Sequence, residues 1–582
     1  PAAVSLQADA GSIIGSPSGL VTTKNLVISA LNGATVSTKV ENVSGRVSGA
    51  GATITINETD DLVVGTATKS LSANNGSITV NAGGAMSVNL ADAGPNGTVT
   101  LAAGSNLTEA VVGTAAEVIA ASANLSSKSG RVDLDTQVTS LTASALASTI
   151  DVDNIGTLPL TLQSVAAANN VRITANSAMT AKSVSSSANN VTLTTLTPVG
   201  TTAANSIFVE TVSALKGVVT LTATGDVLSS DPTGTSPNVL ATTARVSAVS
   251  KADGIITLRT AIGTLGAQAN GDITISELDS ITLGEPTGPT GFQSVLSTAG
   301  NVRVTAGGTI SATDVQATTT KTGITLTSTG GGVQLGSVVT NVLNGLVTVT
   351  ANQSITDGDT KLDVTAKNLV ITSQTGSIGA VDDPIELHVS TVTASAPGSI
   401  YFGNDQALSI TSINGGTVGI SANGGITQTG VINAASLAVT GNGAAIVLDS
   451  QANTLGAFGA TNPASPNGPG TVVVKDTSGS LDMLTSDVAS MVITAAGPVT
   501  QSGAITAPKL TITGTGKDAI SLDTQPNSIG TFTATNGTAG VGIKDAVGSL
   551  DIASIQGGPV NIVAGGPLTQ SGGINATARR CV

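Results

Sequence analysis

The stretch GGITQTGVINAASLAVTG (residues 424–441) decides the fold, because the chain repeats it as GPVTQSGAITAPKLTITG (residues 497–514). A third copy begins with GGPLTQSGGINA (residues 565–576). Between the first two copies, AIVLDSQANTLGAF (residues 445–458) returns as AISLDTQPNSIGTF (residues 519–532). Self-similarity at a period of about seventy residues indicates a repeat protein whose long unit contains several shorter ones.

Each unit is built from short segments in which apolar and polar residues alternate, such as LAVTG, AIVLDS, TVVVKD and MVITAAG. An alternation with period two places Val, Ile and Leu on one face of a strand and Thr, Ser and Lys on the other. Gly, Asn, Asp or Ser stands between the segments and permits tight corners. Strand centres recur about every 9 to 14 residues, so that two or three strands form a coil of roughly 18 to 25 residues. We therefore predict an all-β chain folded as a parallel β-helix, or β-solenoid.

Stacked coils of this kind pair every strand with the strands above and below it, about 4.8 Å away. We expect a single continuous solenoid over residues 1–582 with the shape of an elongated rod. The repeats are looser over residues 1–415, where AGSIIGSPSGLVTTKNLVIS corresponds to the later NQSITDGDTKLDVTAKNLVIT. They are clear over residues 416–578, and residues 579–582 are expected to form an irregular tail.

The composition agrees with a narrow core and excludes several function classes. Hydrophobic residues make up 40% of the chain, yet it contains no Trp, one Tyr and five Phe, so Val, Ile, Leu and Ala must fill the interior. The net charge of −14 is spread thinly, without the basic cluster that nucleic acid requires. No apolar run reaches the roughly 18 residues of a membrane span. We expect neither nucleic-acid binding nor membrane insertion.

The segment SITDGDTKLDVTAKNLVITSQTGSIGAVDDPIELHVSTVTASAPGSIYFGN (residues 354–404), together with the TQSGAITAPKLTITG repeats, carries a family resemblance. It resembles the repetitive region of very large bacterial surface proteins of the filamentous-haemagglutinin type. The resemblance implies a right-handed β-helix that is exported to the bacterial cell surface and serves as an adhesin or matrix fibre. The leading hypothesis is thus a non-enzymatic extracellular fibre or stalk. Its expected partners are other copies of itself, the rest of a longer chain, or cell-surface and matrix glycans.

The alternative is a carbohydrate-active β-helix, a lyase or hydrolase. Its candidate residues are Asp133 and Asp135 in RVDLDT and Asp151 and Asp153 in TIDVDN. Alternation turns both members of each pair outward, and the pairs lie about one coil apart, so they could stack into one patch suited to acid–base chemistry or Ca²⁺. The opposing interpretation is that they lie on different walls and are solvated. The single histidine, His388, is expected to be structural or exposed.

Acidic turns supply the candidates for a metal ion, and Ca²⁺ is the only cofactor considered. TDGDT contributes Asp357 and Asp359, and VDDP contributes Asp382 and Asp383. Their oxygens suit Ca²⁺, although Asp in such turns more often bonds its own backbone. One His and one Cys cannot supply a usual zinc site.

A third hypothesis comes from outward Thr-X-Thr steps in ATITIN and NVTLTTL, which are typical of ice-binding or other surface-binding solenoids. Here the threonines alternate with Ser, Lys, Asn and Asp at variable coil lengths, so a regular Thr face is not expected. This hypothesis ranks below the other two.

The third repeat copy ends differently from the others, in TARRCV. Either the chain is excised from a longer one, or other copies stack on it head to tail and build filaments. In the second case Arg579 and Arg580 would meet an acidic surface of the partner, and Cys581 would crosslink it. A frayed tail is the alternative.

Overall fold

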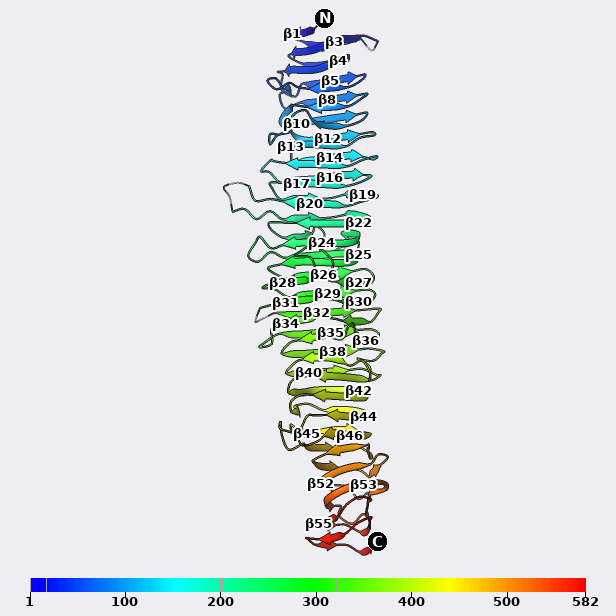
Figure 1. The fold of residues 1–582 in the computed structure, drawn as a ribbon. Helices are drawn as coiled ribbons and strands as arrows, with labels where there is room; N and C mark the ends of the chain where they lie inside the picture. Colours follow the sequence, from blue (N-terminus) through cyan, green and yellow to red (C-terminus); the bar gives the residue numbers. More distant parts are fainter. Residues whose placement is uncertain (1, 17, 199, 201, 320–321) are drawn as a thin grey trace. The chain divides into compact units, whose positions relative to one another are not determined.

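The computed structural model describes residues 2–16, 18–198, 200, 202–319 and 322–582. In these ranges the regular structure consists of strands, from β1 (Ala3–Ala8) to β59 (Ala578–Cys581), and no helix occurs (Figure 1). No helix long and apolar enough to cross a membrane is therefore found in the part of the chain that is described.

The chain divides into two compact units, Pro1–Arg303 and Val304–Val582, hereafter unit 1 and unit 2. Within each unit the strands run parallel and pair with the strands one coil earlier and one coil later. Together the units contain about 27 turns. The prediction of an all-β parallel β-solenoid is confirmed. The prediction that residues 1–582 form one continuous domain stays a prediction.

Aliphatic ladders form the core of unit 1. Ile54 in β5 (Thr53–Glu58) pairs with Ile78 in β8 (Ser77–Ala82), and both are fully buried. The next residue in this ladder is the buried Val99 of β10 (Ala91–Ala103). Burying such a side chain contributes about 1.5 to 3 kcal/mol, and the branched side chains stack on their equivalents in the next coil.

Unit 2 is built in the same way. Ile324 of β32 (Gly323–Ser328) pairs with Val347 of β35 (Leu346–Ala351), 23 positions later. Val347 in turn pairs with Leu369 of β38 (Asn368–Ser373), 22 positions later. These spacings lie within the coil length predicted from the sequence.

Polar side chains line one corner of the coils and explain why the repeat preserves them. Asn453 of β45 (Ile446–Leu455) is fully buried, and its Oδ1 accepts hydrogen bonds from Ile432 N at 3.0 Å and Gln428 Nε2 at 2.8 Å. Its Nδ2 donates to the carbonyl of Lys475, in the following coil, at 3.0 Å. Because this buried amide bonds in both directions, neither its oxygen nor its nitrogen is left unpaired, which avoids a cost of about 1–3 kcal/mol per group.

The equivalent residue of the second copy, Asn527 of β53 (Ile520–Thr535), repeats the arrangement. It accepts from Ile505 N at 2.9 Å and from Gln501 Nε2 at 2.6 Å, and it donates to Lys544 O at 2.9 Å. The Gln and Asn side chains of the repeat thus join one coil to the next through hydrogen bonds.

The predicted irregular tail at residues 579–582 is wrong for its first three residues. Residues 578–581 form β59, which pairs in parallel with β56 (Pro559–Ala564), so that Val560 lies opposite Arg579. Backbone bonds extend to the last residue, where Val582 N donates to Ile562 O at 2.9 Å. The backbone N–H and C=O groups of β56 pair with those of β59, and any non-proline residue provides such groups. Replacing the apolar side chains of the earlier copies by TARRCV therefore does not end the strand pairing.

Candidate functional site

The four aspartates singled out in the sequence do form one patch, the Asp quartet. Asp133 of β13 (Val132–Gln137) lies directly opposite Asp151 of β15 (Ile150–Asn154), and Asp135 lies opposite Asp153. The interpretation that the two pairs occupy different walls is wrong, because the coil between them has the 18 residues that the register requires. Like charges directly opposite each other are unfavourable without compensation.

Compensation comes from Arg172 in β17 (Val171–Ala175), which pairs with Asp151 in the next coil. Its Nη2 lies 2.5 Å from Asp151 Oδ1, and its two terminal nitrogens lie 3.0 Å from the two carboxylate oxygens of Asp153. Burial alone would lower the pKa of Arg172, but its bonds to Asp153 and Asp151 raise that pKa above its ordinary value. The guanidinium remains charged and holds two of the four carboxylates, a role that the sequence analysis missed.

Asp135 also belongs to an acidic triad with Glu109 and Glu117. Glu109 ends β11 (Leu107–Glu109), Glu117 precedes β12 (Val118–Ser127), and the three residues place carboxylate oxygens within 4.8 Å of one another. Asp135 N donates to Glu117 Oε2 at 2.8 Å. Burial raises the pKa of Glu117 to about 7, and burial with the charge of Glu109 raises the pKa of Asp135 to about 6.

A groove of about 560 Å³ opens beside this triad. Glu117 forms part of its wall, together with Lys69 from one coil and Asn89 from another. The remaining lining is made of small polar and aliphatic residues, without an aromatic ring. The volume lies within the usual range of ligand pockets, about 300 to 1,000 Å³.

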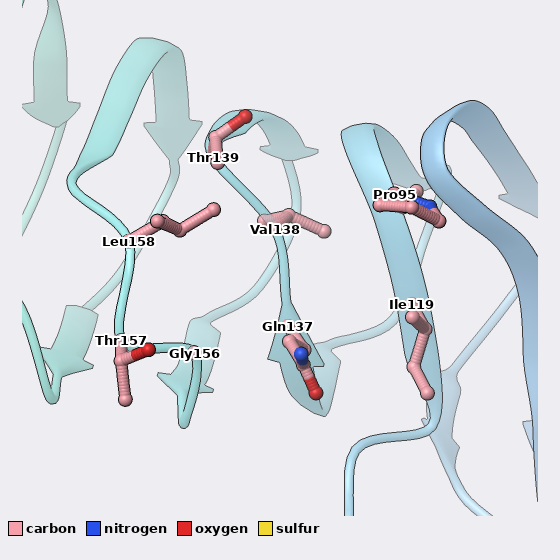
Figure 2. A pocket seen from close by; sticks show the side chains of 9 residues that line it. Pro95, Ile119, Gln137, Val138, Thr139, Gly156, Thr157 and Leu158 are labelled. Carbon is pink, nitrogen blue, oxygen red and sulfur yellow. The ribbon is translucent and has the colours of Figure 1, made fainter.

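A smaller pocket in unit 1 offers no chemistry. It measures about 90 Å³ and lies between successive corners of the coils, where Leu158 points toward Val138 and Val138 points toward the side of Pro95 (Figure 2). Gln137 and Thr139 are among its polar residues, and no titratable side chain lines it. The space is below that of ordinary ligand pockets.

A second acidic group lies in unit 2 and is named the Asp357 cluster: Asp357, Asp363, Asp383 and Glu386. Asp357 ends β36 (Ile355–Asp357), Asp363 precedes β37 (Val364–Thr365), and Glu386 lies in β39 (Ile385–His388). These three residues place carboxylate oxygens within 4.8 Å of one another. Asp383, on the exposed turn before β39, shares a side-chain hydrogen bond with Asp357 but is not one of the three converging carboxylates; burial and that bond raise its pKa.

Three residues of the Asp357 cluster each have a buried oxygen without a hydrogen-bond partner. These oxygens are Oδ2 of Asp357, Oδ1 of Asp363 and Oε2 of Glu386. Asp357 is 7% exposed and Asp363 is fully buried. Burial, with the charge of Asp357 adding to it, raises the pKa of Asp363 to about 9, and burial also raises the pKa of Glu386.

Of the four Ca²⁺ candidates proposed from the sequence, the structure brings Asp357 and Asp383 together and leaves Asp359 and Asp382 exposed outside the cluster. The alternative of backbone bonding also holds in part. Asp357 Oδ1 accepts from Asp359 N at 2.8 Å, and Asp359 Oδ1 accepts from Lys361 N at 2.7 Å. Asp363 and Glu386 were missed.

The remaining candidates belong to neither group, although His388 follows Glu386 by two residues in β39. His388 places Nδ1 2.7 Å from Asp405 Oδ1 in a partly exposed pair. Arg579, Arg580 and Cys581 are exposed, and the Cys581 thiol is free. Arg579 Nη2 donates to the carbonyl of Ile574 in its own chain.

Comparisons with known proteins add no relative. No family model matches the chain, and neither the curated proteins nor the solved structures contain a match. The fold defines the chain as a repetitive parallel β-solenoid protein.

Proposed function

We propose that this chain is a non-enzymatic extracellular β-solenoid that serves as a fibre or stalk at a bacterial cell surface. The observation that carries the proposal is how the repeat uses its best-preserved polar residues. Gln428 and Asn453 in one copy, and Gln501 and Asn527 in the next, bond between coils instead of facing a substrate. A sequence selected for coil-to-coil bonding is selected for a stiff stack of coils.

The Asp quartet supports the same proposal. Arg172 binds Asp151 and Asp153 and thereby occupies the carboxylates that acid–base chemistry on this face would need. A general acid or base has to reach the proton it transfers, and the oxygens of Asp151 and Asp153 are already engaged by the Arg172 guanidinium.

Electron microscopy of the full chain at several concentrations, combined with a glycan-cleavage assay on uronan and neutral glycan substrates, tests this proposal. We expect elongated particles and no cleavage. Filaments that lengthen with concentration would support end-to-end assembly through the exposed edge of β59 with Arg579 and Arg580. In that case Cys581→Ser should abolish any reducible crosslink between copies. Cleavage that survives removal of contaminants would overturn the non-enzymatic proposal.

Glycan binding in the groove beside Glu117 is the second candidate function. The observation that favours it is the groove's ligand-sized volume, with Glu117, a buried residue whose carboxyl has a raised pKa, among its lining residues. In this second proposal the carbohydrate would bind beside Glu117 and not at the Asp quartet, where the sequence analysis placed it. Glycan-array binding that Glu117→Gln abolishes and Asp153→Asn preserves would support it, whereas binding unaffected by Glu117→Gln would exclude the groove. The surface-binding hypothesis based on Thr-X-Thr steps stays a prediction.

A further inference from the structure

We propose that Asp357, Asp363, Asp383 and Glu386 form a divalent-cation site in unit 2, and that Ca²⁺ is its preferred ion. The first step is preorganisation. Glu386 N donates to Asp363 Oδ2 at 2.9 Å, and Asp363 N donates to the carbonyl of Glu386 at 3.1 Å. These reciprocal bonds fix the Asp363 carboxylate relative to the backbone of Glu386 before any ion arrives.

The second step is the set of unused oxygens. Asp357 Oδ1 accepts a hydrogen bond from Asp359 N, and Asp363 Oδ2 accepts one from Glu386 N. The other oxygen of each carboxylate is buried and has no partner, as does Oε2 of Glu386. Buried oxygens without donors are costly. The same three residues place carboxylate oxygens within 4.8 Å of one another, which defines a place for positive charge.

The third step is the lack of a protein cation. Within the described ranges, none of the four carboxylates takes part in an ion pair, whereas the Asp quartet is held by Arg172. Lys361 and His388 each lie two residues from a member of the cluster. Lys361 contacts this loop through its backbone N–H to Asp359, and the His388 ring pairs with Asp405. Compensation therefore has to come from solution, as a metal ion or as bound protons.

The ligand set selects the class of ion. Every available atom is a carboxylate oxygen, and His or Cys does not belong to the cluster, so a hard cation is favoured over zinc. Asp383 lies on an exposed turn, which provides both an adaptable fourth ligand and a route of entry. An irregular set completed by water suits Ca²⁺, which accepts six to eight ligands, better than Mg²⁺, which demands a near-ideal octahedron.

Equilibrium dialysis of the full chain against CaCl₂, with MgCl₂ and NaCl of equal ionic strength as separate arms, tests the site. We expect bound Ca²⁺ at concentrations on the order of 1 mM, the range of extracellular modules. Asp363→Asn should remove one equivalent of bound Ca²⁺ per chain. Hydrogen exchange should show that Ca²⁺ protects residues 355–388 in the parent and not in the variant.

The matched control is Asp482→Asn, in the same unit, because both oxygens of Asp482 already accept bonds from Thr500 and Ser502. It should bind as much Ca²⁺ as the parent. If Asp363→Asn does not fold, Asp383→Asn on the exposed turn is used instead, and it should also lose the one equivalent of bound Ca²⁺. Unchanged Ca²⁺ binding in a folded cluster variant, or no Ca²⁺ bound by the parent, would overturn the proposal and leave shared protons as the compensation.

Discussion

The Asp quartet of unit 1 and the Asp357 cluster of unit 2 arise from the same geometry and differ in how their charge is compensated. Parallel stacking brings carboxylates of successive coils together in both. In unit 1 the next coil supplies Arg172, which contacts Asp151 and Asp153. In unit 2 buried oxygens of Asp357 and Asp363 remain without a partner. A solenoid that repeats an acidic position must therefore balance it with its own cation or take one from solution.

The size of the repulsion between two neighbouring carboxylates shows why their charge has to be compensated. Two carboxylates 4.8 Å apart repel each other by about 3.5 kcal/mol at an effective dielectric constant near 20. That is a large part of the roughly 5–15 kcal/mol by which a domain is stable. In the Asp357 cluster a bound cation or proton would relieve this repulsion.

Removing the arginine should give the largest effect. Arg172→Gln leaves Asp151 and Asp153 without a cation, opposite Asp133 and Asp135. Breaking a buried ion pair costs about 3–5 kcal/mol, but these carboxylates are 38% exposed, so we expect a loss of about 1–2 kcal/mol in unit 1. Urea unfolding followed by hydrogen exchange over β13 to β17 measures it.

Arg131→Gln is the control for this change. The Arg131 guanidinium lies 3.3 Å from Asp133, and its side chain is 55% exposed, so the loss should stay below about 1 kcal/mol. Equal losses in the two variants would contradict the role given to Arg172. If the comparison is sound, Arg172→Gln should also gain a stabilisation by Ca²⁺ that the parent unit 1 lacks.

The reverse experiment supplies unit 2 with a cation of its own. Asp383→Lys places an ammonium group beside Asp357, so Ca²⁺-free unit 2 should gain stability and lose its response to Ca²⁺. We expect a gain of up to about 1 kcal/mol, since the side chain lies on an exposed turn. Thermal unfolding with and without Ca²⁺ measures both effects. Asp382→Lys, next to it but outside the cluster, should leave the Ca²⁺ response intact, and its loss there would show a non-specific charge effect.

The Asp quartet could be predicted because its two strands are separated by a coil of 18 residues, which the spacing of the two motifs in the sequence already gives. Alternation turned Asp133 and Asp135 outward, and a spacing of 18 placed them over Asp151 and Asp153. Arg172 was not found because the following coil is longer, with 21 residues between Asp151 and its partner. Period-two patterns give the face of a strand, whereas the register between coils also depends on the loops.

The Asp357 cluster was found only in part for a related reason. TDGDT identified Asp357, but Asp363 follows an irregular loop, where alternation carries no information. The sequence did hold one signal: when TAKNLVIT is aligned with TTKNLVIS, Asp363 takes the place of Leu20. A carboxylate that replaces the apolar residue of another copy indicates a position whose role differs from that in the rest of the repeat, such as a ligand-binding position.

The acidic triad predicts a pH dependence in unit 1 that Arg172 does not suppress. Glu117 has a pKa of about 7 in the folded chain, against 4.5 ordinarily, because it is buried. Between those values the folded state holds a proton that the unfolded state has lost, so stability falls as pH rises from about 4.5 to 7. Glu117→Gln should flatten this slope by an amount on the order of 1–2 kcal/mol across the window. Urea unfolding at several pH values measures it, and an unchanged slope would mean that other groups carry the dependence.

The smallest effect should come from Asp359→Asn, which separates the two aspartates of TDGDT. Asp359 is exposed, and its Oδ1 accepts a bond from Lys361 N that an asparagine oxygen also accepts. We expect a change in stability below about 0.5 kcal/mol and the same amount of bound Ca²⁺ as in the parent. Asp357→Asn keeps the equivalent turn bond but replaces the buried Oδ2, so it should weaken Ca²⁺ binding. Equal Ca²⁺ binding by these two variants would place the ion on the turn backbone and not among the buried carboxylates, and the contrast with the arginine-paired quartet would then fail.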